Sequence, residues 1–134
     1  MSIENKESLE NVFFFNQNQM QYFEEIEYLI STFGRPFISE INERIYLKFE
    51  KIECQNIFAS INNQFVGLGV YCRDSIKNID LIHIAVEPEY SSRGKLYDKL
   101  IAIQIIGELK AISKRLKGVE TVTVKYLPSC IIDI

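Results

Sequence analysis

Hydrophobic and polar residues recur along this chain with different periods, and each period predicts a different kind of element. From Gln19 to Phe33 the apolar residues return every three to four positions, which predicts an amphipathic helix. Gly34 can adopt the left-handed conformation that caps a helix, and Pro36 cannot continue one. We therefore expect the chain to turn there.

Shorter runs predict strands in the first half of the chain. Val12 to Phe15 is a brief apolar run between polar residues, as in a buried strand. Ile57 to Ile61 and Phe65 to Cys72 are two strand-like runs joined through Asn62 and Asn63. Because asparagine tolerates the positive φ of a tight turn, these two runs predict an antiparallel hairpin.

The second half of the chain predicts a strand, a long helix and another strand. Ile79 to Val86 is apolar at nearly every position, as expected of a strand covered on both faces. Lys95 to Leu116 has helical periodicity and ends at Gly118. Val119 to Val124 alternates valine and threonine, and the intervening helix would place it parallel to the preceding strand.

The segment from Ile38 to Ile52 fits two interpretations. Ile41, Ile45, Phe49 and Ile52 are spaced as on a helix, whereas Ile45, Leu47 and Phe49 alternate as in a strand. We favour the helix, with Ser39 as its N-cap.

Composition limits the classes of protein to which the chain can belong. Its 134 residues, 47% of them hydrophobic, fit a single domain spanning 1–134. With 18 acidic against 15 basic residues and a net charge of −3, we expect no nucleic-acid partner. The three cysteines lack the spacing of a zinc site or a disulfide framework, so we expect no metal and a reducing cytoplasm. The N-terminus does not resemble a signal peptide and no apolar run is long enough to span a bilayer, so we expect no membrane association.

The loop between the central strand and the long helix carries the candidate chemistry. It reads Pro88-Glu89-Tyr90-Ser91-Ser92-Arg93-Gly94-Lys95-Leu96 and lies where a strand ends and a helix begins. Backbone amides at a helix N-terminus have no intrahelical partner and can donate to phosphate oxygens. Gly94 allows close approach to the backbone, while Arg93 and Lys95 add positive charge. Many strand-to-helix turns share these features without binding a ligand, so the loop also has a purely structural interpretation.

The order of elements and the sequence Val86-Glu87-Pro88, followed by Gly94 and the helix from Lys95, resemble the GNAT superfamily of N-acetyltransferases. The resemblance runs from Val12 to about Ser129 and implies an α/β fold with a mixed sheet of about five to six strands and helices on both faces. It implies that acetyl-CoA is bound by the backbone of Ile84 and Val86 and by the loop residues Ser91, Ser92, Arg93, Gly94, Lys95 and Leu96. Of the family's loop pattern the central glycine is retained, whereas Ser91 and Leu96 depart from it.

The same resemblance suggests catalytic residues for transfer of an acetyl group to a primary amine of a small molecule or protein. Asp80 aligns with the strand position of the general base in some members, and His83 is an alternative base. The general acid that protonates the leaving thiolate is Tyr126, a residue of another subunit, or absent, because the family's tyrosine lies in a helix that this chain lacks. Each also has a structural interpretation, as a strand-end carboxylate, a packed core histidine or a cover for the core. With their odd spacing, Asp80 and His83 share one face of the strand only if a β-bulge intervenes.

The C-terminus is shorter than the family's, since only Cys130 to Ile134 follow the segment ending at Ser129. The exposed sheet edge left by this shortening predicts a homodimer. Two further interpretations remain open. One is a non-catalytic GNAT-like module for protein interaction or regulation, and the other is an unrelated α/β regulatory domain.

Overall fold

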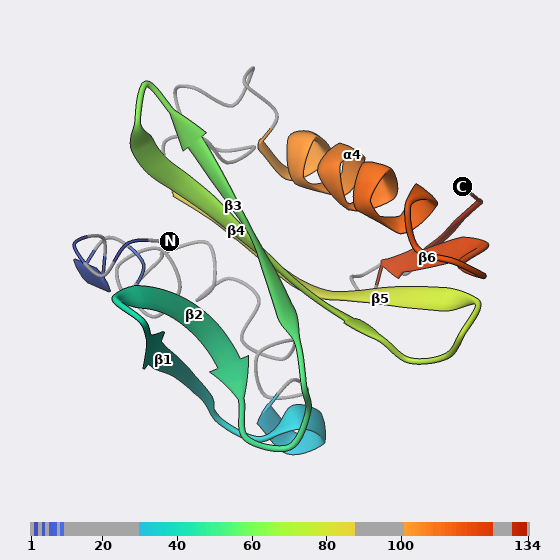
Figure 1. Ribbon diagram of the computed structural model, residues 1–134, viewed down its shortest axis with the longest axis horizontal. Coiled ribbons are helices and arrows are strands. Elements are labelled where there is room, and N and C mark those ends of the chain that lie inside the picture. The colour runs from blue at the N-terminus through green and yellow to red at the C-terminus, as the bar shows by residue number, and fades with distance from the viewer. Residues whose placement is uncertain are drawn as a thin grey trace.

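The computed structural model describes residues 2, 4, 6, 7 and 9 and the ranges 30–87, 101–124 and 130–133 (Figure 1). Most of the described chain forms strands, and one long helix lies among them. In chain order the elements are β1 (Pro36–Ile41), β2 (Arg44–Phe49), β3 (Gln55–Ile61), β4 (Gln64–Arg73), β5 (Asn78–Val86), α4 (Ile101–Lys114), β6 (Thr121–Val124) and β7 (Cys130–Asp133).

Five strands form one mixed sheet in the order β3-β4-β5-β6-β7. Its neighbours are antiparallel except β5 and β6, which run parallel and are connected through α4. The hairpin predicted around Asn62 and Asn63 is confirmed, and both residues have positive φ, 51° and 65°. The parallel strand predicted after the long helix is also confirmed. The chain is therefore a strand-rich mixed α/β protein.

Helix α4 packs on one face of this sheet. Its residues Ile101, Ile105 and Leu109 are at most 1% exposed. The helix lies close to the sheet because β4 carries glycine beneath it: a Cβ at Gly67 would lie 2.7 Å from Ile101 Cγ2, and one at Gly69 would lie 2.5 Å from Ile105 Cγ2. The helix prediction is thus confirmed from Ile101, and the helix ends at Lys114, just before the residue expected.

The hairpin formed by β1 and β2 covers the opposite face, and here the helix expected from Ile38 to Ile52 is wrong. Ile45, Leu47 and Phe49 of β2 are buried in a core with residues of β4 and β5. Ser39, expected to cap a helix, lies within β1 opposite Tyr46. The alternating interpretation prevails because every second residue of β2 meets the sheet, whereas Ile41, which the helix would bury, is 46% exposed.

Each of the two predicted helices is followed by a glycine with positive φ, as expected. Residues 30–33 are helical. Gly34 follows with a φ of 84° and donates its backbone N–H to Ile30 O at 2.9 Å, and Gly118 has a φ of 87°. The strand expected at Val12 to Phe15 lies outside the described residues.

Candidate functional site

A polar cluster centred on Asn78 lies where β5 and β6 begin. Asn78 Nδ2 donates to Oδ1 of Asp74 and of Asp80, each at 2.9 Å. Its Oδ1 accepts from the hydroxyls of Thr121 at 2.7 Å and Thr123 at 3.1 Å. One side-chain amide therefore connects the β4–β5 turn, β5 and β6.

A β-bulge at Ile82 places Asp80 and His83 on the same face of β5. Cys72 of β4 pairs with Asp80 and Val70 pairs with His83, while the register between β4 and β5 shifts between these two pairs. Cys72 and Val70 both belong to the core beneath the β1–β2 hairpin. Because directly opposed residues share a face, Asp80 and His83 point toward that core, as the sequence allowed only with a bulge.

Both candidate bases are buried. Asp80 is 7% exposed and His83 is 4% exposed. A buried carboxylate is costly unless hydrogen bonds compensate for lost hydration, and Asn78 supplies one such bond to Asp80. The arrangement orients the Asp80 carboxylate and places the His83 imidazole further along the same strand face.

β6 pairs with only the first part of β5. Pairing with β6 runs from Asn78 opposite Thr121 to Leu81 opposite Val124. β5 continues to Val86, paired on its other side with β4. Ile84 and Val86, which are predicted to contact the cofactor, therefore lie beyond the part of β5 that pairs with β6 in the described chain. Both are partly buried and pack against the core between the sheet and α4.

Several predicted site residues fall outside the described part of the chain. These are Ser91, Ser92, Arg93, Gly94, Lys95 and Leu96 of the loop, together with Tyr126. The loop residues follow the C-terminal end of β5 in the sequence and precede the described start of α4. Tyr126 follows the end of β6.

Burial also raises the pKa values of two residues, Cys54 and Tyr71. It raises the pKa of the Cys54 thiol, whose Sγ lies 3.6 Å from Leu47 O as a donor. It likewise raises the pKa of Tyr71, which lies opposite Leu81. Both groups thus stay protonated at neutral pH, so Cys54 does not act as a thiolate nucleophile.

Sequence reasoning missed Asn78, Thr121 and Thr123 as members of the cluster. Their spacing held a usable signal, because Asn78 and Asp80 are two residues apart, as are Thr121 and Thr123, and residues so spaced share a strand face. What the sequence did not supply was the register that sets Asn78 opposite Thr121.

No protein-family model, curated protein or solved structure matches this chain. Within the described ranges no helix is both long and apolar enough to cross a membrane. The same residues contain no group of three or more His, Cys, Asp or Glu side chains arranged to hold a metal ion.

Proposed function

We propose that this chain is an acetyl-CoA-dependent N-acetyltransferase of the GNAT type, which transfers an acetyl group to a primary amine of a small molecule or protein. The observation that carries the proposal is the unit β5–α4–β6. Its parallel strands pair from Asn78 to Leu81, β5 continues to Val86, and the Gly94 loop follows the end of β5.

This geometry favours a ligand at the C-terminal end of β5. In open α/β sheets ligands bind outside the carboxyl ends of parallel strands, where the chain changes direction. The β5–β6 pair is the parallel one among the described strands, with antiparallel neighbours on both sides. The bulge at Ile82 adds twist to β5 just where its pairing with β6 ends.

The proposal assigns separate parts of the cofactor to separate residues. The loop from Ser91 to Leu96 holds the pyrophosphate, with Arg93 and Lys95 contributing charge and backbone amides donating hydrogen bonds. The acyl and pantetheine groups lie along Ile84 and Val86. The GNAT-like arrangement of the sheet, with helices on both faces, is part of the same proposal.

In the proposed reaction the amine nitrogen attacks the thioester carbonyl, the C–S bond breaks and an amide forms. Asp80 or His83 takes the proton from the attacking nitrogen, directly or through water. Tyr126 donates a proton to the departing thiolate. Asp80 and His83 share the face of β5 that the β1–β2 hairpin covers, so the proposed reaction requires the amine to reach β5 from the hairpin side.

One observation favours a second candidate function, a non-catalytic GNAT-like interaction or regulatory module. Asp80 takes part in the hydrogen-bond network of Asn78, which joins β5 to β6. A carboxylate engaged in this way has a sufficient structural role without catalysis. The departures at Ser91 and Leu96 point in the same direction.

Calorimetric titration of acetyl-CoA into the purified chain separates the two functions. The transferase predicts binding at about micromolar affinity, abolished by Gly94→Glu, which places bulk and negative charge where the pyrophosphate would lie. The matched control is Gly107→Glu, because Gly107 is exposed on α4 and its added Cβ meets nothing within 4 Å. Absence of binding by the unmodified chain would reject the transferase in favour of the module.

A further inference from the structure

Strand β3 forms an edge of the sheet that carries no charge. It is the outermost strand on its side, and no other described strand pairs with its outer edge along Ile57–Ile61. Its sequence, QNIFASI, contains no lysine, arginine, aspartate or glutamate. Natural proteins commonly protect such an edge with charged residues or proline, since its backbone groups invite another strand to pair. β3 uses neither device.

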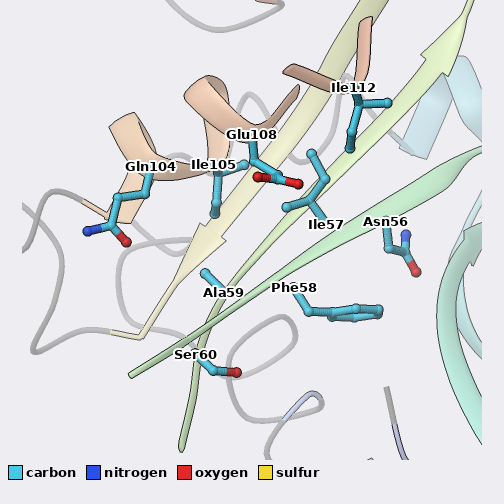
Figure 2. Close-up of a pocket in the computed structure, with 9 residues that line it drawn as sticks. All are labelled: Asn56, Ile57, Phe58, Ala59, Ser60, Gln104, Ile105, Glu108 and Ile112. Atoms are coloured by element: carbon cyan, nitrogen blue, oxygen red, sulfur yellow. The ribbon is translucent and has the colours of Figure 1, made fainter. Parts of the chain in front are cut away.

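A groove runs beside this open edge (Figure 2). It has a volume of about 350 Å³ and lies between β3 and α4. The figure shows α4 side chains along one wall and β3 side chains along the other. The helix contributes Gln104, Ile105, Glu108 and Ile112, and the strand contributes Asn56, Ile57, Phe58, Ala59 and Ser60.

The lining includes side chains from both faces of β3. Ile57 and Ala59 belong to the α4 side of the sheet, whereas Phe58 packs on the hairpin side. A strand added beside β3 would place alternate side chains on these two faces. One set would meet α4, and the other would lie next to Phe58. A groove that follows the edge in this way fits an extended chain.

One end of the open edge is already occupied by the β1–β2 hairpin. Asn56 Oδ1 accepts from Leu47 N at 2.7 Å, and Asn56 Nδ2 donates to Leu47 O at 2.9 Å. The side-chain amide thus satisfies the backbone of β2 in place of a neighbouring strand. Among the described residues, no strand pairs with the outer edge of β3 from Ile57 onward, which is where a further chain would add.

The charge of the groove indicates which chain fits it. Glu108 is the single charged residue among the nine that line the groove, and it is exposed. No ion pair joins it to a cation of the described chain, where the one ion pair found is Lys6–Glu40. An incoming lysine or arginine would pair with Glu108 next to the apolar surface of Ile105 and Ile112.

We propose that the groove between β3 and α4 binds an extended segment of a partner protein as a sixth strand, with a lysine or arginine side chain set against Glu108. Backbone hydrogen bonds to β3 supply affinity, and the apolar wall of α4 with Glu108 supplies selectivity. This interaction is independent of the proposed acetyl transfer.

A second copy of this chain is the less suitable occupant. If two copies paired through β3, each would offer the other the uncharged sequence QNIFASI. Neither copy would then supply a cation from that strand to Glu108. Charge complementarity therefore favours a basic, alternating segment of another protein over self-association.

The test is selection of random ten-residue peptides displayed on phage against the immobilised full chain, followed by affinity measurement on the enriched peptides. We expect alternating apolar peptides with lysine or arginine at one fixed position. Glu108→Lys should weaken their binding about fivefold or more, as expected for loss and reversal of one exposed ion pair. Repeating the selection on Glu108→Lys should recover aspartate or glutamate at that position.

Two controls distinguish strand addition from general attraction to the chain. Glu120→Lys makes the same charge change at an exposed position outside the groove and should leave peptide affinity unchanged. Alternate backbone amides of an added strand point toward β3, and the others point away. N-methylation of the amides that point toward β3 should abolish binding, whereas N-methylation of the others should not. The proposal is overturned if no peptide is enriched, or if Glu120→Lys weakens peptide binding as much as Glu108→Lys does. It is also overturned if light scattering shows that the chain self-associates, that this self-association prevents peptide binding, and that Glu108→Lys does not change it.

Discussion

At the scale of single residues, Asn78 stabilises the region that contains the candidate bases. Its amide makes hydrogen bonds with Asp74, Asp80, Thr121 and Thr123. Asn78→Ala removes all four and leaves the buried Asp80 carboxylate without this donor. We expect the free energy of unfolding to fall by about 2–4 kcal/mol. Urea denaturation measures this change, with Gln64→Ala at an exposed position of β4 as control, and a loss no larger than that of the control contradicts the role given to Asn78.

The positions of Asp80 and His83 show how much of the candidate site was predictable. The sequence identified both residues and the strand that carries them. Strict alternation would have placed them on opposite faces, and the bulge at Ile82 brings them together. Nothing in the apolar run Leu81-Ile82 marks an extra residue, because a bulge is set by pairing with β4. The network of Asn78 likewise depends on a register that local sequence does not fix.

At the scale of elements, the turn between β1 and β2 carries backbone strain. Glu43 has a φ of 64° and Asn63, at the matching place in the β3–β4 turn, has a φ of 65°. Glutamate is less tolerant of this conformation than asparagine. Glu43→Gly should therefore raise the free energy of unfolding by about 1 kcal/mol, and Asn63→Gly should raise it by less. Thermal denaturation of the two variants tests this order, which an equal or reversed effect would contradict.

The same turn explains why a helix was wrongly predicted from Ile38 to Ile52. Apolar residues there satisfy both periods, so the choice depended on recognising a turn at Asn42 and Glu43. Asn-Glu is not a typical hairpin dipeptide, whereas Asn62-Asn63 was recognised because both residues tolerate positive φ. The long helix and the strand after it were predictable because each has one clear period, and the strand before the helix was predictable as a short, almost uninterrupted apolar run.

The approach of α4 to the sheet depends on the glycines of β4. Gly69→Ala would bring its Cβ to 2.5 Å from Ile105 Cγ2, so the helix or the side chain must move. We expect a loss of about 1–3 kcal/mol of unfolding free energy, as for overpacked cores. Gly107→Ala on the exposed face of α4 should instead add up to about 1 kcal/mol, because alanine favours helix. Chemical denaturation measures the free energy of unfolding of both variants. If Gly69→Ala is as stable as Gly107→Ala, close packing of α4 on Gly69 is not needed.

At the scale of the whole molecule, β7 is the other outermost strand of the sheet that the described residues form. This strand is four residues long, and Ile131 within it is 70% exposed. We propose that two copies pair through it, since an apolar side chain on an unpaired edge favours association. Light scattering at micromolar concentration should then give a dimer that Ile131→Lys converts to a monomer. Ile103→Lys, at a position 61% exposed on α4, is the matched control. A monomeric unmodified chain would contradict this interface.

The central claim is that acetyl-CoA binds at the C-terminal end of β5. Hydrogen exchange followed by mass spectrometry, with and without acetyl-CoA, tests it most directly because it reports where the ligand protects the backbone. We predict slower exchange in peptides covering residues 82–100 and unchanged exchange in the β1–β2 hairpin, on the opposite face of the sheet from α4. Unchanged exchange across residues 82–100 at saturating acetyl-CoA, or protection confined to another part of the chain, would contradict the claim.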